Sequence, residues 1–134
     1  MSQENIEVVR RIYDQGLLDG GNDGLLALAA PDIEYVNPPE AIDPGVRRGI
    51  AEVKVALRNI SEPFDAAWNE LHELFDAGDR VIASVSFHTR SRGSDVDVVQ
   101  YEAHTWTIRG GRIVRLEWGR DLQAALEAAG VTNE

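Results

Sequence analysis

The 134-residue sequence contains no cysteine, which excludes a disulfide framework and thiolate chemistry. It has a single lysine, Lys54, and the neighbouring Glu52 and Arg58 indicate a solvated surface charge rather than a Schiff-base nucleophile. No apolar run approaches the ~20 residues of a membrane span. The polar residues 1–5 are not followed by the apolar segment of a signal peptide. We therefore expect a cytoplasmic protein.

Basic residues are also scarce, with 13 Lys and Arg against 23 Asp and Glu, and the formal net charge is −10. Such a charge repels phosphate groups, so nucleic acid and membrane partners are disfavoured. Hydrophobic residues make up 43% of the chain, which is enough to build one core. We therefore expect a single domain over residues 1–134.

Apolar periodicity predicts helices first and strands afterwards. We predict helices over residues 3–18, 22–30, 50–60 and 122–129, strands over 32–37, 64–75 and 80–90, and two further strands within 97–120. This order is typical of an α+β fold. A strongly curved antiparallel sheet has to cover its concave face, and the three N-terminal helices are available for this. The result is a cone, with a short C-terminal helix.

The last two strands are predicted to form a hairpin with its turn at Gly110-Gly111, because glycine supplies the positive φ angles of a two-residue turn. Folding the chain there places Ala103 opposite Trp118 and Thr105 opposite Leu116. These four residues then share the inner face, which continues through Val81, Ala83, Val85 and Phe87 of the preceding strand. The other face of the hairpin is predicted to carry His104, Trp106, Ile108, Ile113, Arg115 and Glu117.

Several motifs resemble the SnoaL-like group of the nuclear transport factor 2-like superfamily. They are Tyr13, Asn22-Asp-Gly-Leu-Leu-Ala-Leu, Pro31-Asp-Ile-Glu, Gly49, Asp76-Ala-Gly-Asp and Gly110-Gly-Arg, in the same order of elements. The resemblance implies a conical fold over nearly the whole chain, but many activities occur on this fold. It also implies a homodimer through the outer face of the sheet, for which we expect contacts from His104, Trp106, Ile108, Ile113 and Arg115.

Ketosteroid isomerase, a member of this superfamily, uses a tyrosine on the first helix, a carboxylate base after the first strand and a second carboxylic acid. Tyr13 matches the tyrosine, but the base position falls on Asn37 and the second acid on Ala103. An amide cannot act as a base near neutral pH, and alanine cannot donate a hydrogen bond. We therefore predict no isomerisation of 3-oxo-steroids.

Limonene epoxide hydrolase offers another partial match. Tyr35-Val36-Asn37 resembles its water-positioning Tyr-x-Asn pair, and Asp121-Leu122 resembles the carboxylate after its last strand. Val85 and Phe87 occupy the positions of its remaining Arg and Asp, which disfavours epoxide hydrolysis. Simpler hydration, dehydration or proton transfer remains open, with Asp121 as acid or base.

Each candidate catalytic residue also has a structural interpretation. Tyr13 lies on an apolar helix stripe and could be a core aromatic. Asn37, before Pro38-Pro39, is a good turn residue, and Asp121 stands where a helix N-cap belongs. Both interpretations remain open at this point.

The predicted cavity lining is mostly apolar, and this suits a compact hydrophobic ligand with one or two oxygens. The expected ligand-binding residues are Tyr35, Val85, Phe87, Ala103, Thr105, Leu116, Trp118 and Arg120. His72, His88 and His104 do not converge in the predicted pairing, so we expect no metal and no cofactor. We predict a protein that binds a small molecule, and isomerase, cyclase or hydratase chemistry is the type of activity that we consider for it. The alternative is a non-catalytic homodimeric module whose cone is filled by side chains.

Overall fold

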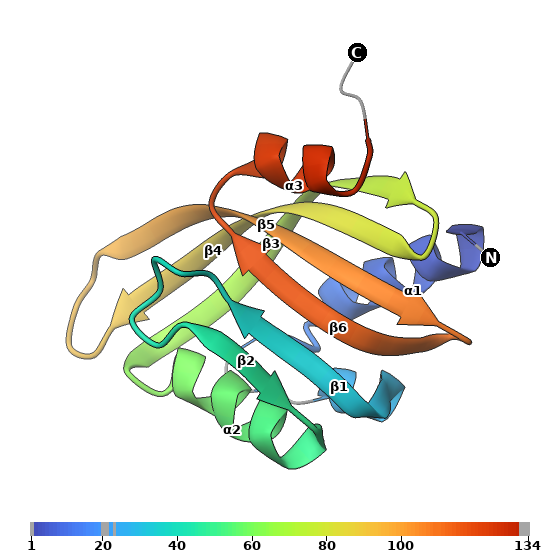
Figure 1. Ribbon diagram of the computed structural model, residues 1–134. Coiled ribbons are helices and arrows are strands. Elements are labelled where there is room, and N and C mark those ends of the chain that lie inside the picture. Colours follow the sequence, from blue (N-terminus) through green and yellow to red (C-terminus); the bar gives the residue numbers. More distant parts are fainter. Residues whose placement is uncertain (1, 20–21, 23, 132–134) are drawn as a thin grey trace.

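The computed structural model describes residues 2–19, 22 and 24–131, and its centre is a strongly bent six-stranded sheet (Figure 1). The strand order is β2-β1-β6-β5-β4-β3. The strands are β1 (Ala29–Asn37), β2 (Gly45–Arg48), β3 (Phe64–Ala77), β4 (Arg80–Ser91), β5 (Asp97–Arg109) and β6 (Arg112–Gly119). The helices are α1 (Ser2–Asp14), the 3-10 helix η1 (Gly24–Leu28), α2 (Ile50–Ser61) and α3 (Leu122–Ala128).

The helices cover both faces of the sheet. On the inner face, α1 packs against β3 and β4, and α2 packs against β1, β2 and β3. Their apolar residues, such as Val9 and Ile12 of α1 and Val53 of α2, are buried in one cluster with Val81 and Val85. On the outer face, α3 covers part of β4 and β5 (Figure 1). The predicted α+β cone is confirmed. No helix within the described residues is long and apolar enough to span a bilayer.

Several details of the prediction are wrong. The sheet is mixed rather than antiparallel, because β1 and β6 run parallel. Residues 45–48, predicted as loop, form β2, and the second N-terminal helix is only the five-residue η1. The first strand begins at Ala29 and therefore includes Pro31, which was predicted to end a helix. Pro31 is tolerated because the pairing of β1 with β6 is irregular between Ala29 and Glu34, where a ladder N–H is not needed.

The hairpin turn is confirmed, but the hairpin register is not. Gly110 and Gly111 have φ angles of 58° and 76° and form the predicted two-residue turn. Ile108 pairs with Ile113 as predicted, whereas the next pair is Thr107 with Arg115. Val114 is therefore the extra residue of a β-bulge, and every pair beyond it is shifted by one position.

The bulge in β6 reverses the faces that were predicted for β5. Because side chains alternate along a strand, a one-residue shift moves a whole set of residues to the other face. The observed pairs are His104 with Trp118, Trp106 with Leu116, and Ala103 with Gly119. Ala103 and Thr105 therefore do not share a face with Leu116 and Trp118, and that prediction is wrong.

The predicted dimer contacts are corrected by the same shift. His104, Trp106, Ile108 and Ile113 are at most 4% exposed and lie inside the chain, so they cannot meet a second subunit. Only Arg115 of the proposed set belongs to the outer face, where it forms ion pairs with Glu34 and Glu117. The homodimer itself stays a prediction, without the four buried residues that were expected to form it.

Candidate functional site

A cavity of about 910 Å³ opens between α2, residues 38–44 and the inner face of the sheet. This volume lies within the usual range of small-molecule sites. The cone is therefore open, which disfavours the alternative of a filled cone. Its wall is formed by Tyr35 and Asn37 of β1, Phe87 of β4, Gln100, Glu102 and His104 of β5, and Leu116 and Trp118 of β6. The mouth includes the exposed side chains of Ile42 and Val55.

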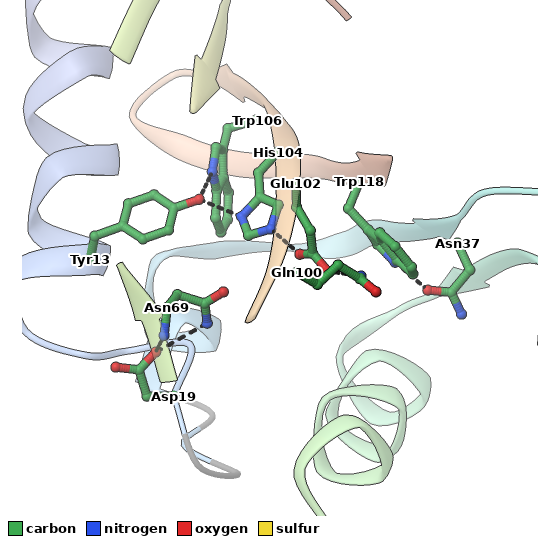
Figure 2. Close-up of polar contacts among 9 residues, drawn as sticks. All are labelled: Tyr13, Asp19, Asn37, Asn69, Gln100, Glu102, His104, Trp106 and Trp118. Carbon is green, nitrogen blue, oxygen red and sulfur yellow. Dashed lines mark hydrogen bonds and ion pairs between the residues drawn. The ribbon is translucent and has the colours of Figure 1, made fainter. Parts of the chain in front are cut away.

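A continuous chain of hydrogen bonds runs from the core to this wall (Figure 2). The Trp106 indole Nε1 donates to the Tyr13 hydroxyl at 2.9 Å, and that hydroxyl lies 2.6 Å from His104 Nδ1. His104 Nε2 lies 2.8 Å from Glu102 Oε1, and Gln100 Nε2 donates to Glu102 Oε2 at 2.6 Å. Tyr13 and Trp106 lie behind the wall, while the other three residues reach the cavity.

The direction of each hydrogen bond follows from the chemistry of its ends. Burial raises the pKa of Tyr13 well above its usual value, so the phenol stays protonated. Its oxygen accepts from Trp106, and its O–H proton is therefore donated to His104 Nδ1. With Nδ1 as the acceptor, the ring hydrogen is on Nε2, where it is donated to Glu102. Glu102 accepts one hydrogen bond at each of its two carboxyl oxygens.

The Glu102 side chain is only 9% exposed, and the His104 side chain is 4% exposed. A carboxylate this buried is costly unless its oxygens are hydrogen-bonded. The two N–H groups of His104 and Gln100 meet that need, and they hold the carboxylate at the cavity wall. The arrangement provides a fixed basic group in a largely apolar space, which is the form of a general base.

Sequence reasoning missed Gln100 and Glu102 altogether and assigned His104 to the wrong face. These residues alternate as Gln100-x-Glu102-x-His104-x-Trp106 on β5, so all four side chains point inward. The available signal was this run of hydrogen-bonding side chains at a period of two. It was hidden because the register of β5 with its neighbours β4 and β6 decides that this phase faces the cone.

Tyr35 is the phenol that meets the cavity. It is 4% exposed and lies beside the Trp118 indole N–H, and no hydrogen bond donated by its own O–H is found among the described residues. Burial, and then the nearby charge of Glu102, raise the pKa of Tyr35, so it stays protonated. Its hydroxyl is therefore available to donate a hydrogen bond to a ligand oxygen.

Asn37 also reaches the cavity, although both ends of its amide already have partners. Its Oδ1 accepts from Trp118 Nε1 at 2.6 Å, and its Nδ2 donates to the Asp43 carbonyl at 2.8 Å. Figure 2 shows the contact between Asn37 and Trp118. Through its second contact, with Asp43, Asn37 ties the wall at β6 to residues 38–44 at the mouth. This geometry favours the structural interpretation of Asn37.

The structure does not bring the three predicted catalytic residues together. Tyr13 lies behind His104, Asn37 lines the main cavity, and Asp121 lines a second recess of about 290 Å³ under α3. Of the predicted ligand-binding residues, Tyr35, Phe87, Leu116, Trp118 and Arg120 line the main cavity. Val85 belongs to the buried core, and Ala103 and Thr105 line the second recess.

The outward position of Ala103 changes one earlier inference. Ala103 was compared with the second carboxylic acid of ketosteroid isomerase, and its lack of a carboxyl group was counted against catalysis. Its two neighbours, Glu102 and His104, are the residues that face the cavity. The cavity therefore does hold a carboxyl group, one position before the residue that was compared.

Asp121 caps α3, as its structural interpretation predicted. Its Oδ1 accepts a hydrogen bond from the Ala124 N–H at 3.0 Å. We expect Asp121→Ala to lower the free energy of unfolding by about 1 kcal/mol, the usual value of an N-cap. Urea unfolding measures this, with Gln123→Ala on the same exposed helix as control. A loss of ligand affinity in Asp121→Ala would contradict a purely structural role.

The histidines do not share a site. His72 contacts Ser86 on the outer face, and His88 pairs with Glu70 at 3.0 Å and stacks on Trp68. Across residues 2–19, 22 and 24–131, no three His, Asp or Glu side chains are grouped closely enough to hold a metal ion.

Comparison with known proteins agrees with this fold. A candidate SnoaL-like polyketide cyclase from Jannaschia sp. CCS1 has a TM-score of 0.75 at 17% identity, covering 98% of this chain and 95% of that one. A Catenulispora acidiphila protein with a ketosteroid isomerase-like fold, in complex with trimethylamine, has a TM-score of 0.71 at 18% identity, covering 94% of both chains. An epoxide hydrolase of the limonene type from M. tuberculosis has a TM-score of 0.70 at 16% identity, covering 96% and 90%.

At these identities the structural likeness establishes the shared fold alone. No curated protein matches the sequence. The sequence does match the SnoaL-like domain family over residues 9–116, which is most of the chain and includes the hydrogen-bond chain from Tyr13 to Trp106. The protein is therefore a member of the SnoaL-like domain family.

Proposed function

We propose that this protein binds a small, mostly apolar molecule with one or two oxygens and catalyses a proton transfer on it. Glu102 is the general base, and the Tyr35 hydroxyl donates a hydrogen bond to the substrate oxygen that gains charge. The reaction class is isomerisation, cyclisation or hydration. The observation that carries the proposal is the buried carboxyl group of Glu102 at the cavity wall, held there by His104 and Gln100.

The surroundings of Glu102 support the role of a base. Both of its oxygens accept hydrogen bonds from side chains that are themselves fixed, so the carboxylate has a defined direction. When it takes a proton, the charge moves from Glu102 to the substrate, where Tyr35 can stabilise it. The pKa of Tyr35 is raised by burial, so its hydroxyl remains a donor throughout.

The wall composition supports a mostly apolar ligand. Phe87, Leu116 and Trp118 provide apolar surface on the sheet side, and Leu57 and Ile60 of α2 provide it on the other. Structural neighbours are consistent with small ligands in this fold. One of them was crystallised with trimethylamine, and another, TerC, with polyporic acid.

Thermal unfolding in the presence of a ligand panel tests binding. The panel contains steroids, aromatic polyketides, terpene epoxides, fatty acids and simple ketones. A ligand present at 100 times its Kd should stabilise the folded protein by about 2.7 kcal/mol. We expect one chemical class to raise the unfolding temperature, and Leu116→Trp, which fills the cavity from the wall, to abolish the increase.

A matched variant on the outer face controls for changes in stability. Tyr101 is 70% exposed, so Tyr101→Trp alters the surface without touching the cavity. It should keep the ligand response of the original protein. An equal response in Leu116→Trp and Tyr101→Trp would place the ligand elsewhere and contradict the proposal.

A further inference from the structure

Arg120 is the one basic residue at the main cavity, within the described part of the chain, that has no acidic or carbonyl partner. Arg47, the other basic residue of the lining, pairs with Asp43 and donates to the carbonyls of Pro44 and Asp43. Glu52 at the rim accepts from the backbone N–H of Arg48. Arg47 and Asp43 are thus paired with each other and Glu52 is bound to a backbone N–H, whereas the guanidinium of Arg120 has no such partner among the described residues.

The position of Arg120 relates it directly to the proposed base. The β5–β6 ladder ends with the pair Ala103 and Gly119, and Glu102 and Arg120 are the residues that follow this last pair. Both residues line the main cavity. They nevertheless form no ion pair, because Glu102 is turned inward to His104 and Gln100 while the Arg120 side chain is exposed. The cavity therefore has a fixed anion on its wall and a free cation at its mouth.

We propose that the ligand of this cavity is an organic anion, an apolar body carrying one carboxylate, and that Arg120 binds the carboxylate at the mouth. This inference rests on the proposed function and names the substrate class of the same site. The planar guanidinium offers two parallel N–H groups to a carboxylate, a geometry that other cations do not supply. Arg120 positions the substrate and takes no part in the proton transfer.

The same arrangement fixes the orientation of the ligand. The negative charge of Glu102 repels a carboxylate from the wall, and Glu52 repels it from the side of α2. The carboxylate therefore binds at the Arg120 end of the mouth. The apolar body of the ligand then lies against Phe87 and Leu116. A carbon of the ligand that carries an abstractable proton is thereby presented to Glu102, while the charged end stays near water.

Titration calorimetry with 2-naphthoate and 2-naphthamide tests the inference, because the two probes have the same shape and differ in charge. We expect the carboxylate to bind the original protein at least about tenfold more tightly than the amide, the order of one charge-assisted bidentate contact. Arg120→Gln should weaken naphthoate by the same factor and change naphthamide less than twofold. The advantage of naphthoate should also shrink in high salt.

Arg120 lines both the main cavity and the second recess, whereas Arg80 lines the second recess but not the main cavity. Arg80→Gln is therefore the matched control. Arg80→Gln should leave naphthoate binding unchanged. If it weakened naphthoate as much as Arg120→Gln does, the carboxylate would lie under α3, and the inference would be overturned.

Other outcomes separate this inference from the proposed function. Equal affinities for naphthoate and naphthamide, or no naphthoate binding while a neutral panel member stabilises the protein, would overturn the anion inference and leave the proposed function standing. Failure of every panel member and of both probes would count against the proposed function itself.

Discussion

Glu102→Gln should lower the rate of proton transfer by roughly 10²–10⁴-fold, the usual contribution of a general base. The substitution keeps the size of the side chain but removes the site that takes the proton. The amide oxygen of the new glutamine can still accept from His104, and the Gln100 amide can turn over to restore the second contact. We therefore expect the cavity, and the affinity for the ligand, to be preserved.

Exchange of carbon-bound hydrogen for deuterium, followed by NMR in heavy water, measures this rate for any ligand that stabilises the protein. The assay needs no knowledge of the complete reaction. Glu70→Gln is the control, because Glu70 is exposed on the outer face and pairs only with His88. Equal exchange rates in Glu102→Gln and Glu70→Gln would remove Glu102 from the chemistry and leave a binding protein.

Tyr13→Phe and Tyr35→Phe make the same chemical change in two different settings, and we expect opposite results. Loss of the Tyr13 hydroxyl leaves the buried Trp106 N–H without an acceptor and His104 Nδ1 without a donor. Each unsatisfied buried group costs about 1–3 kcal/mol, so with two such groups the free energy of unfolding should fall by roughly 2–6 kcal/mol.

Tyr35→Phe should change the free energy of unfolding by less than about 0.5 kcal/mol, because no internal hydrogen bond depends on its O–H proton. It should instead weaken the binding of ligands that carry an oxygen. Urea unfolding and calorimetry on both variants measure the contrast. A Tyr35→Phe variant as unstable as Tyr13→Phe would show that both phenols are structural, and Tyr35 would lose its proposed role.

Local signals in the sequence predicted much of this fold. The apolar stripe of α1, the glycine turn after β5 and the Asp121 cap depend on residues that are close together in the chain. Such features are decided by backbone preferences and by the periodicity of the side chains. They were sufficient for the α+β cone, and the resemblance to the SnoaL-like group added the expectation of a pocket.

The features that sequence reasoning missed depend on contacts between distant segments. The parallel pairing of β1 with β6 joins strands about eighty positions apart, and β2 (Gly45–Arg48) has no apolar alternation to mark it. Nothing local distinguishes Val114 as a bulged residue from any other valine of a strand. The candidate base was missed for this reason, since the phase of β5 depends on its register with the neighbouring strands β4 and β6.

That single bulge has a consequence for how proteins of this fold can change their ligands. The bulge at Val114 decides which residues of β6 face the cone. A regular ladder of the same sequence, continued from the Ile108–Ile113 pair without a bulge, would set Arg115 opposite Trp106 and Glu117 opposite His104, in place of Leu116 and Trp118. The presence or absence of one bulge in this strand therefore exchanges an apolar wall for a charged one, a larger change in chemistry than any single substitution would make.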